Sequence, residues 1–142
     1  MTNIASRVSR LISGSVNAAI DAVENMSPEM VMEQAIREVE VAAAEVRAEL
    51  GKATAERHLA SKKLADNSSK HEELASQIEV AVAEGRDDLA SAAITRQMDL
   101  EAQVPVLEQT VADAAEREKE LEGYIDALKG KRSEMQEELK AF

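Results

Sequence analysis

A seven-residue repeat of apolar positions runs through most of the 142-residue chain and constrains its fold more than any other feature. Between about Pro28 and Glu84, two sets of core positions recur, and only Arg57, Asn67 and His71 place polar side chains in them. One set is Ile36, Ala43, Leu50, Arg57, Leu64, His71 and Ile78, and the other is Met32, Val39, Val46, Ala53, Ala60, Asn67, Leu74 and Ala81. Sustained heptads of this kind predict a coiled coil.

A second heptad segment runs from about Asp87 to the end of the sequence. Its core positions are Ala90, Gln97, Val104, Val111, Glu118, Ile125, Arg132 and Leu139, together with Ala93, Leu100, Leu107, Ala114, Leu121, Leu128, Met135 and Phe142. Pro105 falls outside this seam, so we expect a mild kink and not a break. Gly85 is a helix stop signal, and Asp87 or Asp88 is a candidate N-cap for the second arm. Two segments of nearly equal length joined by a short turn predict an antiparallel hairpin with arms at about 28–84 and 87–142.

Composition agrees with an all-α fold. Aromatic residues make up 1% of the chain, so a conventional globular core of this size is not available to it. Glycine and proline are scarce, at five and two residues, which leaves few turns. We therefore predict a long antiparallel coiled-coil helical hairpin preceded by a short amphipathic helix.

The first 24 residues form a separate segment with a helical period. Its apolar residues share one side of a helical wheel: Ile4, Val8, Leu11, Ile12, Val16, Ala19 and Val23. Gly14 lowers the helicity of this segment, and a helix this short is marginal alone in water. We expect one amphipathic helix that becomes ordered only on a partner. Ser27 as N-cap and Pro28 at the first helical position then predict a new helix.

Charge separates this segment from the rest. The net charge is −11, yet the first 20 residues contain Arg7 and Arg10 and no acidic residue. The acidic body argues against nucleic acid, and the basic tip favours an anionic lipid surface. The predicted membrane-binding residues are Ile4, Arg7, Val8, Arg10, Leu11, Ile12 and Val16. An amphipathic helix can bury the same face on its own hairpin, and the sequence does not separate these two alternatives.

Polar residues in the seam predict specific pairings. Folding about Gly85 brings Arg57 near Glu118, and we infer an ion pair between them. The same fold places Asn67 and His71 opposite the stretch from Leu100 to Val104, and it places Gln97 near Leu74 and Ile78. Such residues lower stability and can fix the register; alternatively, they mark a loosened stretch that contacts a partner.

The sequence offers no constellation for catalysis or cofactor binding, and we predict a protein that is not an enzyme. It has no cysteine and no glycine-rich phosphate loop, and its two histidines, His58 and His71, lie on different levels of one helix. The absence of a signal peptide or a span-length apolar run predicts a cytoplasmic protein. The residues of the turn are either a plain connection or a docking tip for a partner: Glu84, Gly85, Arg86, Asp87, Asp88 and Leu89.

Several short stretches resemble one known family. They are Ser6-Arg7, Val16-Asn17, Ser27-Pro28-Glu29, Gln34-Ala35-Ile36-Arg37-Glu38-Val39-Glu40, Val46-Arg47 and, most specifically, Glu84-Gly85-Arg86-Asp87-Asp88-Leu89-Ala90. The last resembles the Gly-Arg-Glu-Asp-Leu-Ala turn of phage shock protein A and the vesicle-inducing protein of plastids, which are relatives of the ESCRT-III membrane-remodelling proteins. The resemblance covers essentially the whole chain.

The resemblance implies a peripheral membrane-stress protein at the inner face of the cytoplasmic membrane. Members of this family bind anionic membranes through the first helix and assemble into homo-oligomers. It also implies an alternative, a coiled-coil module that restrains an AAA+ transcriptional activator. Relatives often carry a tryptophan before the turn where this chain has Leu74, which weakens that alternative. Relatives also continue past the hairpin into further helices, whereas this sequence stops at Phe142, and we leave open whether it is a hairpin fragment.

Overall fold

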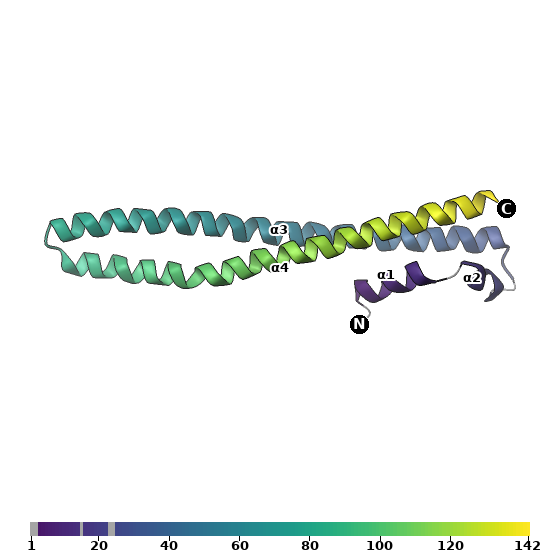
Figure 1. Cartoon of the computed structure of the whole chain (residues 1–142), viewed down its shortest axis with the longest axis horizontal. Coiled ribbons are helices and arrows are strands. Elements are labelled where there is room, and N and C mark those ends of the chain that lie inside the picture. The colour runs from purple at the N-terminus through teal and green to yellow at the C-terminus, as the bar shows by residue number, and fades with distance from the viewer. Residues whose placement is uncertain (1–2, 15, 23–24) are drawn as a thin grey trace. The chain divides into compact units, whose positions relative to one another are not determined.

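The structure, a computed structural model, describes residues 3–14, 16–22 and 25–142, and only the backbone of Val16. Two short helices, α1 (Ile4–Ser13) and α2 (Val16–Ala22), precede two long ones, α3 (Pro28–Ala83) and α4 (Asp87–Lys140) (Figure 1). The described residues contain no strand. Because α3 and α4 pack against each other as a hairpin, the predicted all-α fold class is confirmed.

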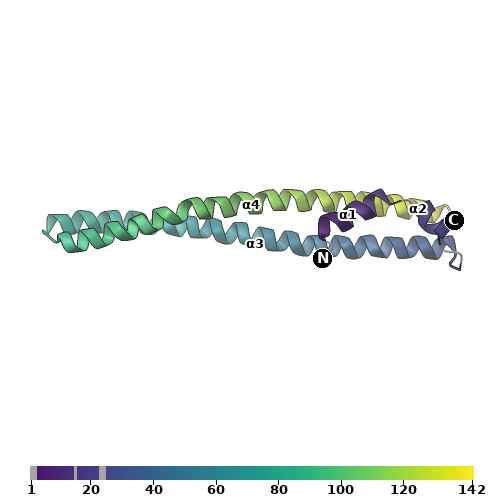
Figure 2. The ribbon, with the colours of Figure 1, turned by 90° about the horizontal axis from the view of Figure 1, so that it is seen from below.

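The chain forms two compact units, each of which includes part of both long helices. The terminal unit comprises Met1–Lys52 and Arg117–Phe142, and the turn unit comprises Ala53–Glu116. The terminal unit contains α1 and α2, which lie beside its portions of α3 and α4 in both views (Figures 1 and 2). The terminal unit therefore has a third layer of helix. The described part of the turn unit consists of portions of α3 and α4 and the turn between them.

The amphipathic segment is two helices where the sequence predicts one. Asn3 caps α1 by accepting a hydrogen bond from the Ser6 amide at 2.8 Å. Gly14 ends α1: its amide donates to the Arg10 carbonyl at 2.9 Å, and a Cβ at Gly14 would lie 2.9 Å from that same oxygen. The extended backbone at Gly14 shifts the helical phase that follows. In α2, Ile20 is half-buried, whereas Ala19, which the sequence predicts in the apolar arc, is exposed.

The turn between the long helices depends on Gly85, whose φ of 73° lies in the left-handed region. The Arg86 amide donates to the Ala81 carbonyl at 2.8 Å, and the Gly85 amide donates to the Val82 carbonyl at 3.1 Å. These two bonds form a Schellman motif, which terminates α3 as the sequence predicts. The predicted N-cap is wrong, because Asp87 and Asp88 both lie inside the first turn of α4. There their negative charges interact favourably with the positive end of the helix dipole.

The heptad pattern describes the seam well on α3. One complete set of positions is buried, from Met32 to Ala81 at intervals of seven residues, with Asn67 included. In the other set, Ile36 and Ala43 are buried and the remaining members are half-buried. In the terminal unit, Ala43 lines one cavity with Arg132 and Leu128, which is the antiparallel register that the sequence predicts.

Two seam positions on α4 are exposed, against the prediction that they lie in the core. Arg132 lines the cavity beside Ala43, but its long charged side chain extends past the apolar seam to reach water. Phe142 is also exposed, because α4 ends at Lys140 and the helical repeat does not extend to residue 142. Pro105 is exposed and α4 continues through it, so it lies outside the seam as predicted.

Candidate functional site

Helix α1 is docked on the terminal unit through the apolar arc that the sequence identifies. Val8, at the centre of the arc, is only 2% exposed. Ile4 and Leu11 are half-buried on either side of it, and Ile12 is 37% exposed at the edge. Of the two alternatives that the sequence left open, the structure therefore shows the helix packed on its own hairpin.

Charged groups flank the docked face of α1. The Arg7 guanidinium forms an ion pair with the carboxylate of Glu45 on α3, and both side chains are partly exposed. One turn along α1, Arg10 and Leu11 line a small cavity together with Arg7 and Glu38 of α3. Glu38 and Glu45 are seven residues apart, so they lie on one face of α3, two turns from each other.

This face of α3 is distinct from the hairpin seam. Val31 and Ala42 are buried at 7% and 3% exposure although neither occupies a heptad core position. Along α3 they are interspersed with Glu38 and Glu45 at spacings of seven, four and three positions, so all four share one stripe. Because Glu45 pairs with Arg7 and Glu38 lines a cavity with Arg10 and Leu11, the stripe lies on the side of α3 where α1 is docked.

The predicted membrane-binding residues are thus divided by their environment. Arg7 is paired with Glu45 and Val8 is buried, whereas Arg10 and Ile12 remain exposed. The side chain of Val16 lies outside the described residues. Sequence reasoning missed Glu38 and Glu45 as partners of this helix. Their seven-residue spacing on a face without a heptad role is a weak signal, because many acidic pairs in this chain share it.

Polar residues in the turn unit form a cluster across the seam. The Asn67 side-chain amide donates to the Leu100 carbonyl at 3.0 Å, and the Gln97 amide donates to the His71 carbonyl at 3.1 Å. The His71 Nε2 and the Glu101 carboxylate are 2.8 Å apart. Asn67 and His71 therefore face the predicted stretch of α4. Gln97 bonds to His71, one turn before the predicted neighbourhood of Leu74 and Ile78.

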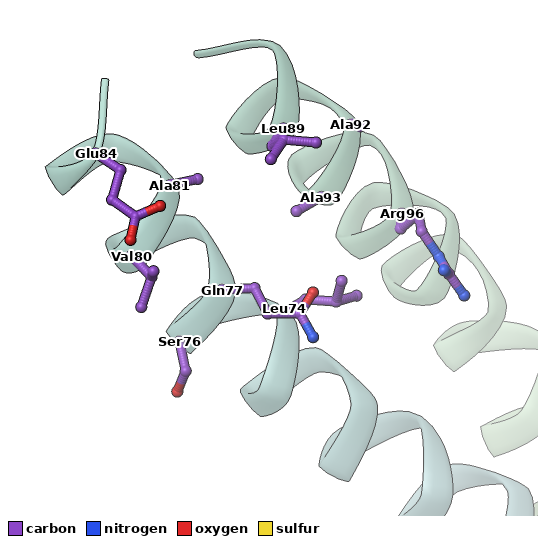
Figure 3. Close-up of a pocket in the computed structure, with 10 residues that line it drawn as sticks. All are labelled: Leu74, Ser76, Gln77, Val80, Ala81, Glu84, Leu89, Ala92, Ala93 and Arg96. Carbon is purple, nitrogen blue, oxygen red and sulfur yellow. The ribbon is translucent and has the colours of Figure 1, made fainter. Parts of the chain in front are cut away.

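The tip of the turn unit carries an apolar groove of about 530 Å³. Figure 3 shows Leu74 and Gln77 extending from α3 toward α4, with Leu89 and Ala93 on the facing helix. The seam is made of alanines here, Ala81, Ala90 and Ala93, which leaves space between the helices. Val80 and Leu89 line the groove and are mostly exposed, and Glu84 and Arg96 border it with opposite charges.

The turn itself is held by charge. Arg86 donates two hydrogen bonds to the Asp88 carboxylate, from Nε and from a terminal nitrogen, each at 3.2 Å. This hydrogen bonding lowers the pKa of the exposed Asp88 carboxyl below its ordinary value of 3.8, and a backbone hydrogen bond from Leu89 adds to the shift.

The predicted ion pair between Arg57 and Glu118 stays a prediction, because these residues belong to different units. Both are half-buried. Each takes part in some polar or electrostatic interaction.

Nothing in the described part of the chain resembles a metal centre, since no three histidine, aspartate or glutamate side chains converge in a suitable cluster. None of its helices is long and apolar enough to cross a bilayer. The two long helices define a structural coiled-coil protein. Its candidate functional features are two surfaces: the short amphipathic helix α1, docked by one face, and the groove at the tip.

A comparison with protein families assigns the chain more narrowly. The model of the PspA/IM30 family matches residues 3–142, so the chain belongs to that family. This family is structural and non-enzymatic, and its proteins oligomerise and bind membranes. A search of curated proteins found no match to this chain.

Proposed function

We propose that this protein is a peripheral membrane protein that binds anionic lipid surfaces through α1 and assembles on them to maintain or remodel the bilayer. The amphipathic character of α1 carries the proposal. Ile4, Val8, Leu11 and Ile12 form its apolar arc, and Arg7 and Arg10 are its only charged residues. A helix of this design lies in the plane of a membrane interface, with the apolar arc at the headgroup boundary.

The strength of this binding explains why assembly belongs to the function. Each base near an anionic surface contributes about 1 kcal/mol, and α1 has two. Its arc is aliphatic and short, with no tryptophan or phenylalanine to deepen insertion. Attachment by one chain is therefore weak, and many copies on one surface gain affinity through avidity. The hairpin is acidic, so it adds no attraction of its own to an anionic surface. The surface that we propose is the inner face of the cytoplasmic membrane.

Co-sedimentation with vesicles tests the proposal. The full chain should pellet with phosphatidylglycerol vesicles, and a chain that lacks residues 1–24 should not. Because the deletion also removes the packing of α1 on the hairpin, a second variant, Arg7→Glu with Arg10→Glu, keeps the length of the chain and should also stay in the supernatant. Pelleting of both variants at the level of the full chain would exclude α1 as the membrane-binding element.

A second candidate function is docking of an AAA+ transcriptional activator at the hairpin tip, and the apolar groove favours it. Val80 and Leu89 expose apolar surface there, beside the charged rim formed by Glu84 and Arg96. Leu89→Glu should abolish inhibition of the activator's ATPase. Val82→Glu is a matched control, because Val82 is similarly exposed at the tip and does not line the groove. If both variants inhibited the ATPase equally, the groove would be excluded as the docking site.

A further inference from the structure

We propose that the docking of α1 is an autoinhibitory contact, in which Glu45 of α3 acts as a protein substitute for an anionic lipid headgroup. The hairpin and the membrane would then compete for one face of α1. This inference rests on the proposed function and concerns the regulation of the same site.

The competition follows from the geometry of the docked face. Val8 is 2% exposed, so the centre of the apolar arc cannot be buried in the hairpin and in a bilayer at the same time. Arg7 directs its guanidinium to the Glu45 carboxylate. A guanidinium binds carboxylates and phosphates with the same planar set of donors, so the group that holds α1 on the hairpin is the group that would hold it on lipid.

The docked state is weak enough to be displaced. Of the described α1 side chains, only Val8 is fully buried, and the Arg7–Glu45 pair is partly exposed on both sides. Exposed ion pairs contribute little and are screened by salt. A lipid surface of sufficient negative charge offers α1 many anionic groups and a larger apolar environment, so it can compete for this helix.

One exposed base provides a starting point for the exchange. Arg10 is exposed in the docked state, on the side of α1 away from Val8. It can reach a membrane surface before α1 leaves α3. The contact therefore sets a threshold: a weakly charged surface meets only Arg10, and a strongly charged one releases Arg7 and Val8 as well.

The test uses Glu45→Gln in the full chain, with two measurements. In the absence of lipid, amide hydrogen exchange over residues 4–13 should become faster, because the ion pair no longer holds α1. With vesicles of phosphatidylglycerol in an excess of phosphatidylcholine, the lipid concentration for half-maximal binding should fall about two-fold to five-fold, as expected for loss of one exposed ion pair. Glu33→Gln is the matched control, because it makes the same charge change at an exposed position on another face of α3. It should leave exchange over residues 4–13 at the wild-type rate.

A charge exchange separates docking from lipid binding. Arg7→Glu with Glu45→Arg rebuilds the pair with opposite polarity, so protection of α1 from exchange should return. Binding to the vesicles should stay below wild type, because α1 has exchanged a base for an acid. This combination of restored protection and weak binding is not expected if Glu45 affects binding only through the overall charge of the protein.

The outcomes distinguish the two proposals. A wild type that binds vesicles, beside a Glu45→Gln variant that matches Glu33→Gln in binding, overturns the autoinhibitory contact and leaves the proposed function intact. Faster exchange in Glu45→Gln without tighter binding also overturns the competition. Absence of vesicle binding in every form overturns the proposed function and this inference with it.

Discussion

The side-chain amide of Asn67 on α3 donates a hydrogen bond to the backbone carbonyl of Leu100 on α4, at a distance of 3.0 Å. Asn67 is 6% exposed and occupies a seam position that is otherwise filled by apolar residues. A buried asparagine in a coiled coil costs stability and favours one register, because only that register satisfies its amide. The polar cluster of Asn67, His71 and Gln97 thus specifies how the turn unit pairs its two helices.

Replacing Asn67 with leucine should raise the free energy of unfolding by about 1 kcal/mol, since burial of a leucine exceeds the net value of one hydrogen bond. The Leu100 carbonyl keeps its place in the hydrogen-bond ladder of α4. Urea denaturation measures the change, with the exposed Ala65→Leu as control. A loss of stability in Asn67→Leu would show that its amide contributes more than register.

The Arg57–Glu118 pair should appear as a coupling energy in a double-mutant cycle. Because both side chains are half-buried, we expect about 1 kcal/mol between Arg57→Ala and Glu118→Ala, near the upper limit for exposed pairs. Chemical denaturation of the four proteins gives the value. Strictly additive effects would mean that the register differs from the predicted one at this level.

Val8→Glu should weaken vesicle binding about ten-fold or more, the equivalent of losing one buried valine. The carboxylate would lie at the centre of the apolar arc, against lipid or against the hairpin. Ser9→Glu is the control, since it adds the same charge on the exposed side of α1. If the two variants bound equally weakly, charge alone would account for the loss, and the apolar arc would not be the inserted face.

The two bases of α1 should differ in their effects. Arg10→Gln removes a lipid contact worth about 1 kcal/mol and should weaken binding to anionic vesicles accordingly. Arg7→Gln removes a lipid contact and also the pair with Glu45, so the two effects partly offset each other and the net loss should be smaller. Titration with vesicles compares them. Added salt should reduce the difference between wild type and Arg10→Gln by screening the surface charge.

The turn should respond to acid through Asp88. Its pKa is lowered in the folded state, chiefly by the hydrogen bonds from Arg86. This carboxylate therefore stabilises the fold above its unfolded-state pKa, and that contribution is lost as the pH falls through the lowered folded-state value. Arg86→Gln should move the pKa of Asp88 upward toward its ordinary value, which NMR titration of the carboxyl carbon detects. Arg96→Gln should leave it unchanged.

Local pattern was sufficient for much of the fold. The heptads predicted two long helices and the buried set from Met32 to Ala81, because burial in a coiled coil repeats with the sequence period. The turn at Gly85 followed from the need for a residue that tolerates positive φ. The errors at Asp87, Arg132 and Phe142 occur where a helix begins or ends or where a long side chain reaches solvent, and pattern is least informative there.

The sequence by itself determined that the first segment is amphipathic and basic in an acidic protein, since side-chain chemistry and helical period fix that property. It could not determine what the apolar arc of α1 contacts, because lipid and protein offer the same hydrophobic driving force. Only the tertiary structure decided this, by bringing Glu45 to Arg7 across 38 positions of chain and by burying Val8 in the terminal unit. Contacts between residues so far apart depend on how the chain folds back and where α1 packs on the hairpin. The periodic pattern of the sequence contains no information on either.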